Sequence, residues 1–137
     1  MPHDPIRVAD TRAWLRRANR DLRTAAHVMT AEPPLLDAAV FHCQQAVEKA
    51  MKALLVWHDL PFRKTHNLEE LGAACLRFDQ TLDAFVALAA PLTEYAWKFR
   101  YPGELLEPSE TEAREALQIA RDVYDAVAER IPSDARP

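Results

Sequence analysis

Glycine is scarce in this chain of 137 residues, which contains only Gly72 and Gly103. A P-loop or a dinucleotide-binding loop needs several glycines on one tight turn, so the sequence excludes both kinds of phosphate-binding loop. No apolar run approaches the roughly 20 residues that a membrane-spanning helix needs. The opening residues, MPHDPIRVADT, include an acid and lack the apolar segment of a signal peptide. We therefore expect a soluble protein of the cytoplasm.

Nucleophilic and metal-ligating residues are also few. Cys43 and Cys75 fall inside helical patterns, so we expect reduced, partly buried thiols. The only serines are Ser109 and Ser133, which we interpret as a helix cap and a tail residue. The five histidines and two cysteines show neither H-x-x-x-H nor C-x-x-C spacing. We therefore expect no metal and no cofactor.

The sequence does contain helical periodicity interrupted by prolines, without any period-two alternation that would indicate a strand. It predicts helices over about 8–30, 35–58, 67–77, 80–100 and 109–130, with a kink or restart at Pro91. Asn67 and Ser109 are typical helix N-cap residues. We expect one all-α domain over 1–137, an antiparallel helical bundle with its core at about 8–130 and a frayed tail at 132–137.

The second predicted helix has two contrasting faces. Alanines and larger apolar residues, from Ala39 to Leu54, share one face, and the small alanines allow a neighbouring helix to approach closely. The opposite face carries Gln45, Glu48, Lys49 and Lys52, with Phe41 among them. One interpretation is a solvated face with an i,i+4 pair between Glu48 and Lys52. The other is that Phe41 forms the floor of a cleft or a subunit contact.

Three motifs together carry a family resemblance. They are FHCQQAVEKAMKALL at 41–55, Thr65-His66-Asn67-Leu68, and Phe99-Arg100-Tyr101-Pro102. In order and spacing they resemble the HEPN domain family. The resemblance implies an up-and-down bundle of four to five helices that forms homodimers and binds a nucleotide or RNA. It also implies pairing with a small nucleotidyltransferase in a toxin–antitoxin-like system.

Many HEPN proteins are metal-independent ribonucleases with an Arg-x(4–6)-His motif near the end of the bundle. In that chemistry histidine transfers protons and arginine stabilises charge on the scissile phosphate. No histidine follows Arg100 within ten residues, so the motif is absent from its expected place. Arg20 and His27 match the spacing, but on the first helix, which makes them weak catalytic candidates. A ribonuclease toxin is therefore the alternative function, and a structural dimer without ligand is a further one.

Residue-by-residue matching to the family gives a candidate ligand site of six residues: Gln45, Lys49, Lys52, His66, Arg100 and Tyr101. Lysine and arginine would hold phosphate oxygens, and Tyr101 would stack on a base or close the pocket. A second basic feature is a row on the first helix, formed by Arg12, Arg16, Arg20 and Arg23. This row would follow a nucleic-acid backbone or an acidic partner, or it would simply be solvated opposite the acidic last helix.

Overall fold

The computed structural model describes residues 2–102 and 107–137, and in these ranges all regular structure is helical. The α-helices are α1 (Pro5–Val28), α2 (Leu36–Trp57), α3 (Leu68–Leu76), α4 (Asp83–Ala89) and α5 (Glu110–Glu129). Short 3-10 helices are η1 (Gln80–Leu82), η2 (Ala90–Ala96) and η3 (Ser133–Ala135). None of the described helices is long and apolar enough to cross a membrane. The all-α prediction is confirmed.

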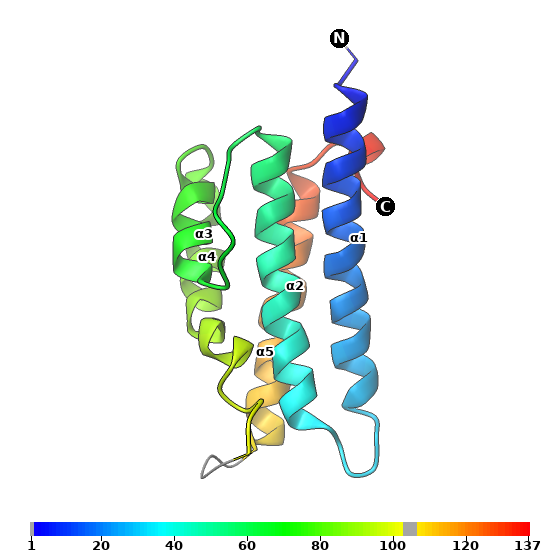
Figure 1. The fold of residues 1–137 in the computed structure, drawn as a ribbon, viewed down its shortest axis with the longest axis vertical. Coiled ribbons are helices and arrows are strands. Elements are labelled where there is room, and N and C mark those ends of the chain that lie inside the picture. Colours follow the sequence, from blue (N-terminus) through cyan, green and yellow to red (C-terminus); the bar gives the residue numbers. More distant parts are fainter. Residues whose placement is uncertain (1, 103–106) are drawn as a thin grey trace.

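Helix α2 lies at the centre of an antiparallel bundle. It contacts α1, α3, α5 and η2, with α1 on one side, α3 and α4 on the other, and α5 behind it (Figure 1). Ala39, Ala46 and Ala50 are completely buried on α2, as the pattern of small residues predicts. Because a central helix is surrounded by neighbours, its polar side chains are buried along with its apolar ones, and this determines the character of the site.

Capping residues set the ends of the helices. Asn67 Oδ1 accepts hydrogen bonds from the backbone amides of Glu69 and Glu70, and Ser109 Oγ accepts one from Glu112. Both predicted caps are confirmed. Helix α1 begins at Pro5, earlier than the expected residue 8, because Asp4 caps it and proline is favoured in a first helical turn.

The segment over 80–100 is not one long helix. Helix α4 ends at Ala89, and the chain continues as the 3-10 helix η2, with Pro91 near its start. Proline has no amide hydrogen to donate, so the predicted interruption at Pro91 is confirmed. Leu92, Tyr95 and Ala96 of η2 are buried. Trp97 is 52% exposed and lies outside the core of this chain.

The last residues differ from the expected frayed tail. Residues Ser133–Ala135 form η3, and the side chain of Ala135 is completely buried. The Arg12 guanidinium donates a hydrogen bond to the backbone oxygen of Asp134, which ties the segment to α1. Burial of Ala135 together with this hydrogen bond explains why the segment packs against the bundle.

Candidate functional site

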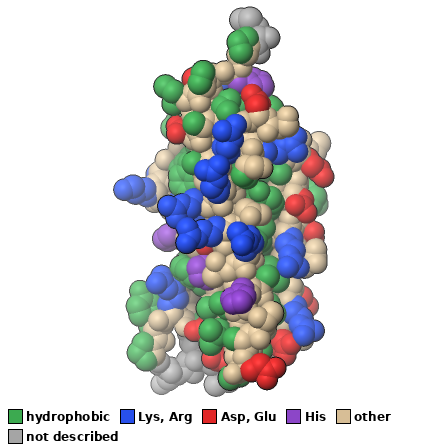
Figure 2. Space-filling view, turned by 90° about the vertical axis from the view of Figure 1, so that its right-hand side faces the viewer, with side chains coloured by type: hydrophobic (Ala, Val, Ile, Leu, Met, Phe, Trp, Pro, Cys, Tyr) green, Lys and Arg blue, Asp and Glu red, His purple; other side chains and the backbone are tan. Residues whose placement is uncertain are grey.

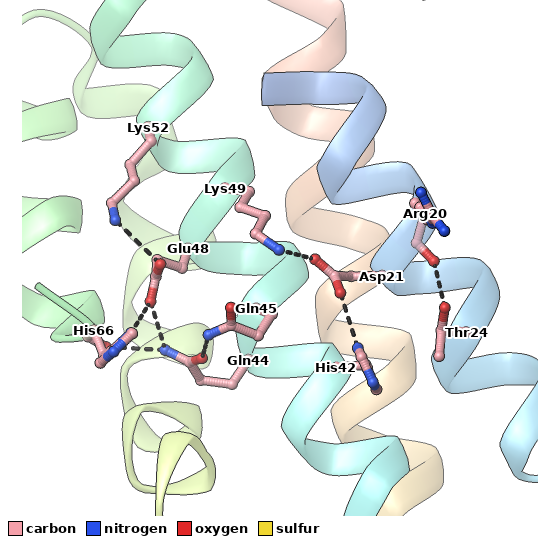
Figure 3. A network of polar contacts seen from close by, with 10 residues as sticks. All are labelled: Arg20, Asp21, Thr24, His42, Gln44, Gln45, Glu48, Lys49, Lys52 and His66. Atoms are coloured by element: carbon pink, nitrogen blue, oxygen red, sulfur yellow. Dashed lines mark hydrogen bonds and ion pairs between the residues drawn. The ribbon is translucent and has the colours of Figure 1, made fainter. Parts of the chain in front are cut away.

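Asp21 connects α1 to α2 through two polar contacts (Figure 3). Its Oδ2 lies 2.6 Å from Lys49 Nζ, and its Oδ1 lies 2.8 Å from His42 Nδ1. Burial raises the pKa of Asp21, but the bonds to His42 and Lys49 together lower it more, so the net pKa lies below the ordinary value of 3.8. Asp21 is therefore an ionised carboxylate that fixes the positions of one histidine and one lysine.

On the other side of α2, Glu48 likewise contacts one lysine and one histidine. Its carboxylate, with a side chain only 5% exposed, lies 3.1 Å from Lys52 Nζ and 2.7 Å from His66 Nδ1. The Gln44 amide donates to the Glu48 carboxylate and to the backbone oxygen of His66, and Gln45 donates to Gln44 (Figure 3). This network attaches the connection before α3 to the central helix.

Lys52 is buried, which corrects the interpretation of this side of α2 as a solvated face. Its ammonium lies 5.6 Å from the ring centroids of both Trp14 and Phe62. The predicted i,i+4 pair with Glu48 does form, but both side chains are less than one-tenth exposed. The reason is that α1 supplies Trp14 and the connection after α2 supplies Phe62, and together they cover the pair. An ammonium between two aromatic rings and a carboxylate is electrostatically well matched.

A groove of about 370 Å³ lies between α1 and α2 on the side of Lys49. It is lined by Asp10, Ala13, Trp14, Arg17 and Lys49. The groove thus combines an aromatic ring with a guanidinium and an ammonium. Because Asp21 holds the Lys49 ammonium, this cation is fixed at the wall of the groove, where its side chain is 23% exposed.

A second hollow, of about 640 Å³, continues from the groove over the outer surface of α1. It is lined by Ala13, Arg16, Arg17, Asn19, Arg20 and Arg23. We call Arg16, Arg17, Arg20 and Arg23 the arginine cluster. Figure 2 shows Lys and Arg side chains gathered along the middle of this face. The chain carries a net charge of −4, so this face is a local basic region on an acidic protein.

Arg100 lies in a third hollow, of about 240 Å³, which Phe41, His42 and Phe99 also line. The guanidinium carbon of Arg100 is 4.5 Å from the centroid of the Phe41 ring. Phe41 is consequently half-buried beneath a residue of its own chain, and it forms part of the wall of this hollow. Tyr101, the next residue, is 74% exposed.

The six predicted ligand residues lie in three places. Lys49 lines the groove beside α1. Lys52, His66 and Gln45 belong to the Glu48 network, and Arg100 lies in the hollow beside Phe41, followed by the exposed Tyr101. The structure therefore does not gather all six around one ligand.

The weak catalytic candidates Arg20 and His27 are both exposed on α1. They lie two helical turns apart, and no described hydrogen bond joins their side chains. Nothing in this arrangement pairs an acid–base group with an arginine.

Asp21, Trp14 and Arg17 are among the residues of the site that sequence reasoning missed. Asp21 carried a readable signal, because it is a charged residue among the apolar residues Leu22 and Ala25 on the core face of α1. A charge in that place needs a buried partner. A single tryptophan in a helical pattern is more often a packing residue than a ligand contact, and Arg17 falls beside the predicted row, so neither stood out.

Both cysteines are free and buried, as predicted. Burial raises the pKa of Cys43 and of Cys75 to about 12, so both remain thiols at neutral pH. They act as apolar core residues.

Comparison with models of protein families matches residues 11–131 to the HEPN domain. Comparisons with curated proteins and with solved structures give no significant match. The family match spans nearly the whole chain and confirms the resemblance inferred from the three motifs. The protein belongs to the HEPN domain family.

Proposed function

We propose that this HEPN protein binds a nucleotide in the groove between α1 and α2 and acts with a small nucleotidyltransferase in a toxin–antitoxin-like system. The observation that supports the binding role is the groove itself, in which the Trp14 ring lies with Arg17 and Lys49. Arginine and lysine bind phosphate oxygens through charge-assisted hydrogen bonds, and an indole ring stacks on a base.

The two cations of the groove differ in whether a carboxylate neutralises them, and this difference favours one position for a phosphate. Lys49 is paired with Asp21, whereas no described carboxylate forms an ion pair with Arg17. A phosphate is therefore best placed beside Arg17, with Lys49 as a second contact. Asp10 repels phosphate, but its carboxylate can accept hydrogen bonds from ribose hydroxyl groups.

Calorimetric titration with adenosine and guanosine monophosphates tests the site. Removing one phosphate-contacting cation costs about 1.5–3 kcal/mol, or roughly ten- to a hundredfold in affinity. We expect that loss in Arg17→Gln and in Lys49→Gln, and no loss in the control Lys98→Gln, whose lysine pairs with Glu94 in η2. Absence of binding by the wild-type protein at millimolar nucleotide would contradict the proposal.

The partner is proposed from family membership, since HEPN proteins are commonly paired with a nucleotidyltransferase. Affinity purification of the tagged protein at native expression, followed by mass spectrometry, should recover such an enzyme. Recovery of the HEPN chain alone would count against a stable complex.

A specific observation also supports a second function, cleavage of RNA without a metal. Asp21 holds His42 Nδ1, and His42 shares its hollow with Arg100. His42 would accept the proton of a 2′-hydroxyl at its other ring nitrogen, and Arg100 would stabilise charge on the attacked phosphate. This arrangement needs no Arg-x(4–6)-His motif, because three separate segments supply its residues.

Incubation with single-stranded and structured RNA in the presence of a metal chelator tests for metal-independent cleavage. If the second one operates, His42→Asn and Arg100→Gln abolish cleavage, whereas Arg20→Gln and His27→Asn leave it intact. Intact RNA after incubation with the wild-type protein removes this candidate. Cleavage lost only in the Arg20 and His27 variants would instead assign activity to the formal motif on α1.

A further inference from the structure

We infer that the nucleotide bound in the groove is a nucleoside polyphosphate, whose phosphate chain lies over the arginine cluster of α1. This inference rests on the proposed nucleotide site and names the class of its ligand. The observation that supports it is that the groove and the neighbouring hollow adjoin and share lining residues.

The arginine cluster is a concentrated cationic surface. Arg16 and Arg23 are seven residues apart, which corresponds to about 10 Å along a helix at 1.5 Å per residue. All four guanidinium groups belong to exposed residues, and no described carboxylate forms an ion pair with them. Their mutual repulsion is relieved when a multiply charged anion binds among them.

The groove and the hollow are adjoining parts of one surface. Ala13 and Arg17 line both of them. A phosphate beside Arg17 therefore lies next to the other guanidinium groups of the hollow. The small side chain of Ala13, which lines both the groove and the hollow, leaves room for a ligand to extend from one to the other. Asn19 adds an amide that can donate hydrogen bonds to phosphate oxygens.

The number of aromatic rings on this surface decides the ligand class. Trp14 lines the groove, and none of the aromatic residues that the structure describes lines the hollow. A single-stranded nucleic acid is usually bound with an aromatic platform for successive bases. One platform followed by four arginines instead fits one base followed by several phosphates.

Backbone amides of a glycine-rich loop are not available to this protein, which has only two glycines. The hollow is lined by residues from the interior of α1, whose backbone amides are already used in helix hydrogen bonds, so contacts to a phosphate chain there come from side chains. Arginine suits this role, because its planar fork binds two oxygens of one phosphate at once.

Calorimetry with adenosine mono-, di- and triphosphate, without divalent cations, tests the inference on the full-length protein. We expect affinity to rise by about tenfold with each added phosphate. Arg20→Gln and Arg23→Gln should each remove about tenfold of the triphosphate affinity and leave the monophosphate affinity unchanged. Lys49→Gln should weaken all three ligands. The control Arg77→Gln, an exposed arginine next to α3, should alter none of them.

The outcomes separate this inference from the proposed function. Equal affinities for the three nucleotides overturn the inference and leave nucleotide binding standing, whereas absence of all binding removes both. Inorganic tripolyphosphate that binds as tightly as the triphosphate overturns it, because the base would then contribute nothing. Tighter binding of a single-stranded oligonucleotide, lost in Arg20→Gln, overturns it in favour of a polymeric ligand.

Discussion

At the scale of single residues, two carboxylates of this protein form the same pair of polar contacts, but their lysine partners differ in exposure to solvent. Asp21 and Glu48 each bind one lysine ammonium and one histidine Nδ1. The lysine at Asp21 remains at the wall of a groove, whereas the lysine at Glu48 is enclosed by aromatic rings. Lys49 is therefore available to a ligand, and Lys52 contributes to stability.

Replacement of Lys52 by alanine should destabilise the fold. It would leave the buried Glu48 carboxylate without its ammonium partner, and breaking a buried pair in this way costs about 3–5 kcal/mol. Lys98→Ala is the matched control, because Lys98 and Glu94 form an i,i+4 pair of the same orientation in a more exposed place. We expect the control to cost less than about 1 kcal/mol. Urea denaturation with equal losses in both variants would contradict the buried role of Lys52.

Asp21 should make stability depend on pH in the acid range. Its pKa in the folded protein lies below the ordinary 3.8, so its ionised form stabilises the fold above that value. This contribution is lost as the pH falls through the folded-state pKa. The difference in unfolding free energy between wild type and Asp21→Asn should therefore shrink below about pH 4. Urea midpoints showing a difference that persists or grows at lower pH would refute this assignment.

At the scale of elements, local signals predicted the helices well and the environment of α2 poorly. Asn67, Ser109 and Pro91 act within a few residues, so the sequence alone predicts caps and an interruption. The burial of Lys52 beside Glu48 depends on Trp14 from α1 and Phe62 from the connection after α2, which belong to other segments of the chain. Periodicity identifies which residues of a helix lie opposite its apolar face, but it does not reveal what covers them.

The contact between α3 and α4 depends on Gly72. This residue is buried, and a Cβ added there would overlap Cγ1 of Val86. Gly72→Ala should therefore destabilise the protein by about 1–3 kcal/mol, although alanine favours helix formation. The double variant Gly72→Ala/Val86→Ala should recover part of this loss, because the overlapping methyl group is gone. Thermal denaturation in which Gly72→Ala is more stable than wild type would contradict the close packing.

At the scale of the whole molecule, the groove and the arginine cluster adjoin on one face, and the buried Asp21 holds Lys49 at the wall of the groove. Figure 2 shows the gathered Lys and Arg side chains, and Figure 3 draws Asp21 with Lys49. The sequence predicted Lys49 and three arginines of this face, Arg16, Arg20 and Arg23, but not Arg17. It did not place Trp14 beside Lys49, because that proximity depends on how α1 and α2 pack. The sequence also predicted Arg100 as a ligand residue, but Arg100 contacts Phe41 and lies in a hollow separate from the groove.

Homodimer formation remains a prediction at this scale. The family relationship favours it, and Leu88, Trp97 and Tyr101 leave apolar surface exposed that a second copy would cover. Light scattering at micromolar concentration should give a mass near twice the 15.6 kDa of one chain. A mass of a single chain would show that the protein is a monomer under these conditions.

The fluorescence of Trp14 reports whether a nucleotide binds in the groove between α1 and α2. The chain has three tryptophans, so Trp57→Phe/Trp97→Phe leaves Trp14 as the only one. Stacking of a base on the indole ring should quench this emission and saturate with nucleotide concentration, and Arg17→Gln should shift the titration to weaker binding. Emission that stays constant while calorimetry detects binding would place the nucleotide elsewhere and contradict the proposed site.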